Sequence, residues 1–303
     1  MVTSTPASPI RPLLWLLAGS ICISFAPIFI RLADVAPDSA GFYRMLFAGL
    51  SLFLLLRLKG VSLSMHRKTL LLLVWSGLSL SVDFMCWHRS IHYVGPGLAT
   101  LIGNFQVFFT AIFSCFLFKE KISRMFISAV LMALLGMFCI TGVDWGSLDE
   151  GYRLGMLFGL GTAIFYSGYI LLLKSAMNHQ EVSGVSAMFV IAATCTGFFS
   201  VITPVTGSSF IIPDATSFWA LVGAGVVCTT IGWSLISTAI KHTTATITGL
   251  FLLLQPALAF VWDVLFFSRP TTGREVFGVL LILSAIYVGS YRRQARVVHR
   301  PSA

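Results

Sequence analysis

The 303-residue chain carries a net charge of +9, yet 57% of its residues are hydrophobic and only 10% are charged. Soluble domains contain about 25% charged residues, and the apolar residues here recur in blocks of about 20, the length that crosses about 30 Å of hydrocarbon. Composition therefore excludes a water-soluble fold and predicts an integral membrane protein. The basic residues stand in short gaps between apolar blocks and form no continuous stripe, so we expect no nucleic-acid partner.

Cysteine usage argues against disulfides and metals. All six cysteines lie inside apolar blocks, and the sequence has no CxxC motif and no His/Cys cluster with the spacing of metal ligands. We therefore expect no cofactor. The apolar run 13–30 could pass for a signal peptide that ends near Ser24-Phe25-Ala26. Because the run continues past that point, and about 18 apolar residues suffice to cross a membrane, we expect it to remain as the first span.

Apolar windows separated by polar or Gly/Pro-containing breaks predict an all-α integral membrane protein with ten transmembrane helices. Their ranges are 13–32, 38–58, 69–90, 93–118, 124–142, 154–174, 183–203, 216–240, 243–267 and 275–291. The spans must be helices, because backbone polar groups in lipid have to be satisfied within each segment. With the N-terminus inside, 14 of the 20 Lys and Arg residues fall on the inner side and 6 on the outer side. This excess predicts that both termini are cytoplasmic.

The two halves of the chain resemble each other. A shift of 149 residues places Gln106 on Gln255 and Phe118 on Phe267. Five spans per half is an odd number, so the second half must enter the membrane upside down, and two five-helix inverted repeats result. Such repeats can rock about a central site and expose it alternately, as in many secondary transporters. The predicted parts are a cytoplasmic tail at 1–12, a first repeat at 13–142, an outer connecting loop at 143–153, a second repeat at 154–291 and a basic cytoplasmic tail at 292–303.

One stretch of the sequence carries a family resemblance. It runs from Trp87 to Thr100, then through Asn104 and Gln106 to Phe118-Lys119-Glu120-Lys121-Ile122-Ser123, and it resembles the fourth-helix signature of the EamA family in the drug/metabolite transporter superfamily. Tyr43-Arg44, Gln255-Pro256-Ala257 and the segment 273–278 extend the resemblance over essentially the whole chain. The resemblance implies a ten-helix carrier of the cell inner membrane, often an exporter of amino acids or other metabolites.

The chain departs from the family pattern at one place. Family members commonly carry a proline in the fourth span where this sequence has Gln106-Val107, whereas Pro256 occupies the matching place in the second half. We therefore expect a different pore shape on the side of the fourth span.

Asp83, within the third span, is the first candidate for substrate binding. An acidic residue near mid-membrane costs about 2.5 to 3.5 kcal/mol on insertion scales, so its side chain should face protein or water. Trp87 follows at i+4 on the same helix face and adds a surface for a cationic or aromatic group. A structural hydrogen bond is the alternative role of Asp83, and exchange of a proton against substrate is a further one.

Other polar side chains lie near the middles of their spans. Asn104, Gln106 and Gln255 can bind a polar solute, or they can link neighbouring helices by hydrogen bonds worth about 0.6 kcal/mol on average. The remaining candidates for substrate binding are Tyr166, Trp233 and Asp263. Packing explains most aromatic residues in such positions.

Several residues have an interfacial explanation. Arg44 follows an acidic outer loop with Asp34 and Asp38, so an interfacial ion pair or a lipid headgroup contact explains it, with a substrate carboxylate as the lesser option. His88, Arg89 and His92 are expected at the outer end of the third span, where they extend toward the interface. Small residues such as Gly155, Gly159 and Gly161 would let helices approach closely.

Other functional classes have less support. The sequence has no HExxH motif, no GxSxG motif followed by a suitable histidine and no aspartate pair at catalytic spacing, so we expect no enzyme. A channel would need rings of like residues or re-entrant filter loops, whereas the apolar blocks here are typical of uninterrupted full spans. A flippase-like carrier of a lipid-linked substrate is the closest alternative. We predict a secondary transporter whose partners are a small-molecule substrate and the lipid bilayer, with export of amino acids as the best guess; proton coupling and oligomeric state stay open.

Overall fold

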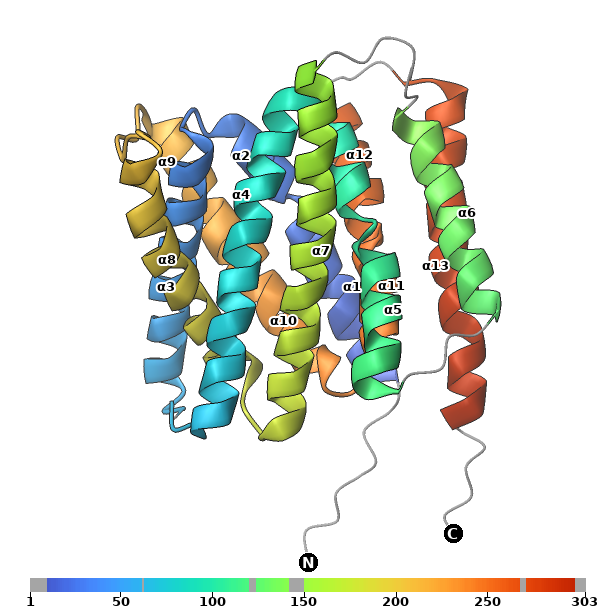
Figure 1. Cartoon of the computed structure of the whole chain (residues 1–303), viewed down its shortest axis with the longest axis horizontal. Helices are drawn as coiled ribbons and strands as arrows, with labels where there is room; N and C mark the ends of the chain where they lie inside the picture. Colours follow the sequence, from blue (N-terminus) through green and yellow to red (C-terminus); the bar gives the residue numbers. More distant parts are fainter. Residues whose placement is uncertain (1–9, 62, 120–123, 142–149, 268–270, 298–303) are drawn as a thin grey trace, which may run out of the picture.

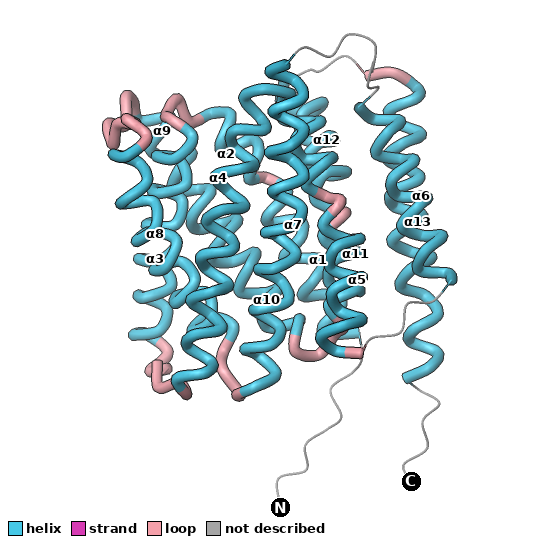
Figure 2. The backbone as a smooth tube through the Cα atoms, viewed as in Figure 1, coloured by secondary structure: helices cyan, strands magenta, loops and turns pink. Residues whose placement is uncertain are grey.

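The structure, a computed structural model, describes residues 10–61, 63–119, 124–141, 150–267 and 271–297. Every element in these ranges is helical (Figures 1 and 2). The elements are α1 (Ile10–Ser24), α2 (Ala26–Leu32), α3 (Pro37–Leu58), α4 (Arg67–Gly103), α5 (Gln106–Phe118), α6 (Arg124–Thr141), α7 (Glu150–His179), α8 (Gly184–Val205), α9 (Ala215–Gly223), η2 (Ala224–Trp233), α10 (Ser234–Ile240), α11 (Ala245–Leu252), α12 (Leu254–Phe267) and α13 (Gly273–Val297).

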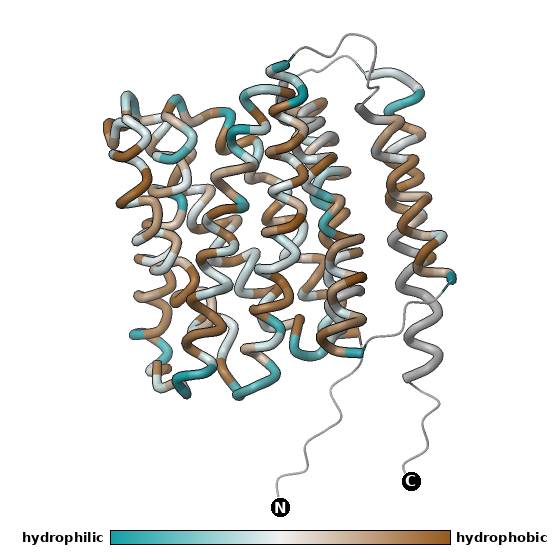
Figure 3. The backbone as a smooth tube through the Cα atoms, in the orientation of Figure 1, coloured by the Kyte–Doolittle hydropathy of each residue, from teal (hydrophilic) through white to brown (hydrophobic). Residues whose placement is uncertain are grey.

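The prediction of an all-helical membrane protein is confirmed. Within the described residues, 7 helical segments are long and apolar enough to cross a membrane, and Gln106–Phe118 and Arg124–Gly136 are shorter apolar helices. Hydrophilic residues gather at the two ends of the bundle, and the helix middles are mostly apolar (Figure 3). The predicted tails at 1–12 and 292–303 and the connecting loop at 143–153 fall partly outside the described residues. Their described parts, residues 10–12, 150–153 and 292–297, are helical and belong to α1, α7 and α13.

The predicted break between the third and fourth spans is wrong. α4 is one helix of 37 residues, about 55 Å at 1.5 Å per residue, and the chain stays helical through residues 91–92 and leaves the helix only at Asn104 and Phe105. The polar side chains that suggested a break are accommodated by other helices; Ser90 Oγ, for example, donates to the carbonyl of Gly155 at 2.8 Å. Hydropathy registers these side chains as polar, although the backbone that carries them remains helical.

Small residues allow α4 and α7 to pack closely. A Cβ atom on Gly155 would lie 2.5 Å from Cγ1 of Val94, and one on Gly159 would lie 2.9 Å from Cβ of Ile102. Across the same interface, Ser76 Oγ donates to the carbonyl of Tyr169 at 3.0 Å. Direct backbone approach with hydrogen bonds between helices is a usual packing mode in lipid, where the hydrophobic effect does not drive helices together.

The helices pair across the two halves of the sequence. α3 packs on α8, α5 on α11 and α6 on α13, while α4 packs on α7 and α1 packs on η2 and α10. One buried apolar cluster joins α1, α3, α4, α7, α8, η2 and α10, and a second joins the end of α4 with α5, α6, α11, α12 and α13. The start of α1 and the end of α13 lie at the same end of the bundle (Figure 1).

Candidate substrate site

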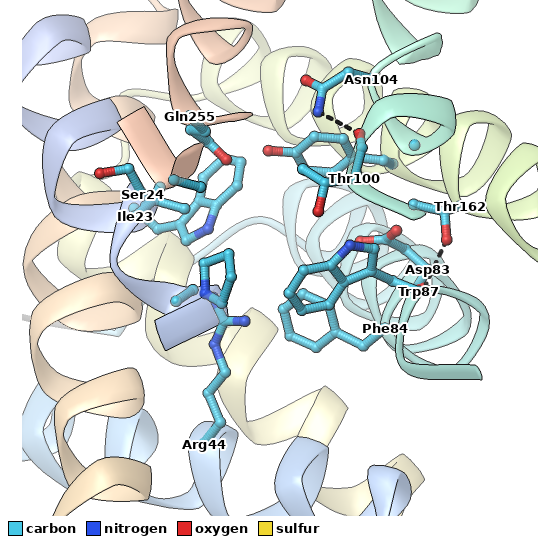
Figure 4. Close-up of a pocket in the computed structure, with 16 residues that line it drawn as sticks. Ile23, Ser24, Arg44, Asp83, Phe84, Trp87, Thr100, Asn104, Thr162 and Gln255 are labelled. Carbon is cyan, nitrogen blue, oxygen red and sulfur yellow. Dashed lines mark hydrogen bonds between the residues drawn. The ribbon is translucent and has the colours of Figure 1, made fainter. Parts of the chain in front are cut away.

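A cavity that is partly open to solvent lies among α1, α2, α3, α4, α7, η2 and α12. Its lining residues are Ile23, Ser24, Ala26, Pro27, Arg44, Asp83, Phe84, Trp87, Thr100, Gly103, Asn104, Thr162, Tyr166, Trp233, Gln255 and Ala259 (Figure 4). Small-molecule sites are typically lined by apolar side chains with a few polar groups that fix the orientation of the ligand. This cavity has such a lining, with mostly apolar walls and a few polar groups.

Interruptions of helical geometry gather around this cavity. α1 ends and α2 begins at Phe25, α4 gives way to α5 at Asn104, and α11 gives way to α12 at Leu253. The segment η2, which ends at Trp233, is a π-helix of 10 residues. Broken helices and π-helical segments occur preferentially at functional sites, where they free backbone groups and allow movement. Pro256 stands in the first turn of α12, where a missing N–H is tolerated.

Asp83 and Trp87 both line the cavity from α4. Asp83 is 4% exposed, and its Oδ1 has no hydrogen-bond partner. Thr162 Oγ1 donates a hydrogen bond to the backbone carbonyl of Asp83 at 3.4 Å, so this contact does not involve the carboxyl group. A carboxylate that is buried without a partner is strongly disfavoured, so this side chain is available to a ligand or to a proton. The structural hydrogen bond that the sequence left as the alternative does not engage Oδ1.

Arg44 is the cavity residue that the sequence interpretation placed elsewhere. It lies on α3, is 2% exposed, and points its guanidinium into the cavity (Figure 4). Nε donates to Thr229 Oγ1 at 3.0 Å, and the guanidinium lies 4.5 Å from the ring centroid of Phe84. The expectation of an interfacial ion pair or lipid contact is therefore wrong. The sequence pattern misleads here because Arg44 stands only two turns after Asp38 at the start of α3, whereas the structure buries both side chains and gives them different partners.

Asp38 pairs with another arginine. Asp38, at the start of α3, receives two hydrogen bonds from Arg89 at 2.9 Å each and a third from Thr206 Oγ1 at 2.9 Å. Arg89 is thus an ion-pair partner between helices, with its side chain 25% exposed. His88 is buried at 4% exposure, so the expected interfacial position is wrong for His88. His92 is exposed, as the interfacial interpretation requires.

The two repeat-related glutamines have different surroundings. Gln106 is fully buried outside the cavity lining; its Nε2 donates to the carbonyl of Gly249 at 3.3 Å, and its Oε1 accepts from Thr110 Oγ1 at 3.0 Å. Gln255 lines the cavity, and its Nε2 is buried with no hydrogen-bond partner. Gln106 therefore links helices, and Gln255 offers a free donor to the cavity.

Asn104 lies at the break after α4 and lines the cavity, with its Nδ2 donating to the carbonyl of Thr100 at 2.7 Å. Trp233 forms an edge-on contact with Tyr166 at 5.9 Å between ring centroids, and another with Tyr169 at 4.8 Å. The rings of Trp233 and Tyr166 line the cavity, and Tyr169 packs against both of them outside the lining. The side chain of Asp263 lies outside the described residues.

Trp262, next to Asp263 on α12, contacts the junction between α1 and α2. Trp262 Nε1 donates to Ser24 Oγ at 2.7 Å, and the Trp262 ring stacks on Phe25 at 4.6 Å between centroids. Among the described residues, no group of three or more His, Cys, Asp or Glu side chains could hold a metal ion. The polar groups that line the cavity are one guanidinium, one carboxyl group, side-chain amides and hydroxyl groups.

The chain is similar in sequence to several bacterial transporters. The chain is 24% identical over 245 residues to the pseudopaline exporter CntI of Pseudomonas aeruginosa, covering 80% of this chain and 82% of that protein. It is 25% identical over 319 aligned positions to the uncharacterized inner membrane transporter YhbE of Escherichia coli, covering 95% and 96%. It is also 24% identical over 230 residues to a probable amino-acid metabolite efflux pump of Escherichia coli, covering 73% and 76%.

A solved crystal structure has the same fold, with a TM-score of 0.78 at 17% identity, covering 95% of this chain and 99% of that chain. The sequence profile of the EamA-like transporter family matches residues 10–142 and 153–291, two copies that together span most of the chain. Both the resemblance noted in the sequence and the expectation of a non-enzymatic carrier are confirmed. The protein belongs to the EamA-like transporter family of the drug/metabolite transporter superfamily.

Proposed function

We propose that this transporter exports a small metabolite, with amino acids and related compounds as the best class, by alternating access through the cavity between α3, α4 and α12. The observation that carries the proposal is the cavity itself, where unpartnered polar groups and interrupted helices meet inside a membrane-spanning bundle. Ionisable residues inside a membrane commonly mark substrate or ion pathways. The substrate-binding residues that we propose are Asp83, Trp87, Asn104, Tyr166, Trp233 and Gln255.

The packing supports two inverted halves of five helices each. The first half would consist of five units: α1 together with α2, then α3, the first part of α4, the end of α4 together with α5, and α6. The second half would consist of α7, α8, the segment from α9 to α10, α11 together with α12, and α13. The pairs α3 with α8, α5 with α11 and α6 with α13 then join equivalent helices, and the α4–α7 pair becomes the counterpart of the contact of α1 with η2 and α10. This exchange symmetry is what a two-fold axis in the membrane plane would produce.

The distribution of charge and the names of relatives support the proposed membrane placement and direction. The excess of basic residues on one side favours cytoplasmic termini, and the relative YhbE is named an inner membrane transporter. Two relatives carry names of export or efflux. We therefore propose export across the cell inner membrane.

Reconstituted transport tests the proposal. The purified protein is placed in liposomes loaded with unlabelled amino acid mixtures, and uptake of radiolabelled amino acids by counterflow is measured against empty liposomes. We expect accumulation that ceases when the internal solute is omitted. A protein that exchanges no amino acid or related metabolite, while scrambling a fluorescent lipid-linked sugar, would refute metabolite export and support the flippase alternative.

A further inference from the structure

The cavity contains two ionisable groups of opposite type, a guanidinium and a carboxyl group, that form no ion pair with each other among the described residues. Arg44 on α3 and Asp83 on α4 are 2% and 4% exposed, and both line the cavity. Within the part of the chain that the structure describes, no ion pair joins them, whereas Arg89 and Asp38 nearby form a bidentate pair. A buried charge without a partner is costly, and it is tolerated where a ligand supplies the partner.

Arg44 has unused donors. Among the described residues, its side chain makes one hydrogen bond, from Nε to the hydroxyl of Thr229, which leaves both terminal nitrogens of the guanidinium for a ligand. Those nitrogens present the planar fork that binds a carboxylate through two parallel hydrogen bonds. The unpartnered Nε2 of Gln255 adds a neutral donor, and Figure 4 places Gln255 and Arg44 on the same side of the cavity in that view.

Asp83 supplies the complementary acceptor. Its Oδ1 is buried without a hydrogen-bond partner, and Figure 4 shows the Asp83 carboxylate beside Trp87, across the cavity from Arg44. An ammonium group carries three donors and no acceptor, so it suits a carboxylate, and the indole face of Trp87 adds a favourable surface for a cation.

We infer that the cavity selects a dipolar solute, in which Arg44 binds an anionic carboxylate and Asp83 binds a cationic ammonium group of the same molecule. This inference rests on the proposed function and names the two residues that determine its specificity. A monoanion would leave Asp83 uncompensated, and a monocation would leave Arg44 uncompensated. Only a ligand that carries both charges neutralises both residues, and the rings of Phe84, Tyr166 and Trp233 would contact its apolar part.

Binding to three matched series of ligands tests this selection. Each series contains an amino acid, its amide, which lacks the anion, and its deaminated acid, which lacks the cation: leucine with leucinamide and 4-methylpentanoate, and the corresponding compounds of alanine and phenylalanine. Affinities are measured by calorimetry on the full-length protein in nanodiscs. We expect wild-type protein to bind at least one amino acid about 30-fold more tightly than either of its single-charge counterparts.

Two variants should invert this preference. Arg44→Gln leaves Asp83 as the uncompensated charge, so the amide should become the preferred ligand; Asp83→Asn leaves Arg44, so the deaminated acid should become preferred. If either residue had a purely structural role, its substitution would lower the affinity for all three ligands of a series together. Matched controls are Arg57→Gln on the exposed part of α3 and Asp34→Asn in the exposed loop before it, and both should keep the wild-type order.

The outcomes separate this inference from the proposed function. Inverted preferences in the two variants support it, and because an inverted variant still binds a ligand, its site is intact. An unchanged order, equal loss of all ligands, or no binding of any amino acid by wild-type protein overturns it. If counterflow of other metabolites persists in any of these cases, the proposed export function stands without the dipolar selection. Absence of counterflow for every solute refutes the function itself.

Discussion

Arg89 donates from both terminal nitrogens to the two carboxylate oxygens of Asp38, each at 2.9 Å, so the acid at the start of α3 is neutralised by α4 and not by Arg44 of its own helix. Thr206, at the C-terminal end of α8, adds a third bond to the same carboxylate. One ion pair therefore links three helices at one end of the bundle and leaves the deeper arginine for the cavity.

The Arg89–Asp38 pair should stabilise the fold. In Arg89→Gln the carboxylate of Asp38, which is 2% exposed, loses its charged partner and keeps only a neutral one. We expect a loss of about 2 to 3 kcal/mol, measured as a lower midpoint of thermal unfolding in detergent. The double variant Arg89→Gln/Asp38→Asn should recover part of that loss, because no unpaired charge remains. Equal stability of Arg89→Gln and wild-type protein would contradict this account.

The α6–α13 pair should depend on one glycine. A Cβ atom on Gly136 would lie 2.5 Å from the carbonyl oxygen of Gly278, a backbone atom that cannot rotate away. Gly136→Ala should therefore separate the two helices and destabilise the protein by about 1 to 3 kcal/mol.

Gly197 on α8 is the matched control for Gly136. A Cβ atom there meets nothing within 4 Å, and alanine forms helices more readily than glycine by about 1 kcal/mol. Gly197→Ala should hold or raise the unfolding midpoint. If Gly136→Ala also holds or raises the unfolding midpoint, the close contact between α6 and α13 is contradicted.

Hydropathy predicts where the chain crosses the membrane because the bilayer imposes a length and an apolar composition on every span. It does not predict where a backbone helix stops. The sequence placed a break at residues 91–92, whereas α4 runs on to Gly103 and breaks at Asn104 and Phe105. That break adjoins the cavity, where local backbone rules are commonly relaxed for function.

Tertiary neighbours decide what the sequence left open for the polar residues. Gln106 and Gln255 have the same side chain and matching places in the two halves, yet one bonds to Gly249 and Thr110 and the other faces the cavity. The nearness of Asp38 in sequence predicts an interfacial position for Arg44. Arg89, distant in sequence from Asp38, forms the ion pair instead, and no local pattern reveals such a partner.

The two glutamines should separate stability from transport. Gln106→Leu removes two buried hydrogen bonds and leaves the carbonyl of Gly249 without the amide donor, so the protein should lose about 1 kcal/mol or more of stability. Gln255→Leu removes an amide whose Nε2 has no hydrogen-bond partner, although the side chain also interacts with Tyr166. Stability should therefore fall less than in Gln106→Leu, while the rate of counterflow falls. Unfolding midpoints and counterflow rates of both variants check this. If Gln106→Leu instead lowers only the counterflow rate and Gln255→Leu lowers only the stability, Gln106 belongs to the binding site and Gln255 to the contacts between helices.

Proton coupling, if the carrier uses it, should depend on Asp83. A carboxylate that binds either a proton or a substrate cation exchanges one for the other, so a pH gradient would drive substrate against its own gradient. Among the described residues, Asp83 is the one acidic side chain in the lining of the cavity. We expect wild-type liposomes to accumulate substrate when a pH gradient is imposed, with the membrane potential held at zero by potassium and valinomycin.

Asp83→Asn should abolish that accumulation, because an amide exchanges no proton. The variant is tested with the deaminated acid that we expect it to prefer, so that lost coupling is distinguished from lost binding: counterflow of this ligand should continue, independent of the pH gradient. Asp34→Asn, in the exposed loop between α2 and α3, should respond to the gradient as wild-type protein does. Gradient-driven accumulation that persists in Asp83→Asn would exclude this carboxyl group as the coupling site, and the absence of any gradient response in wild-type protein would establish facilitative transport.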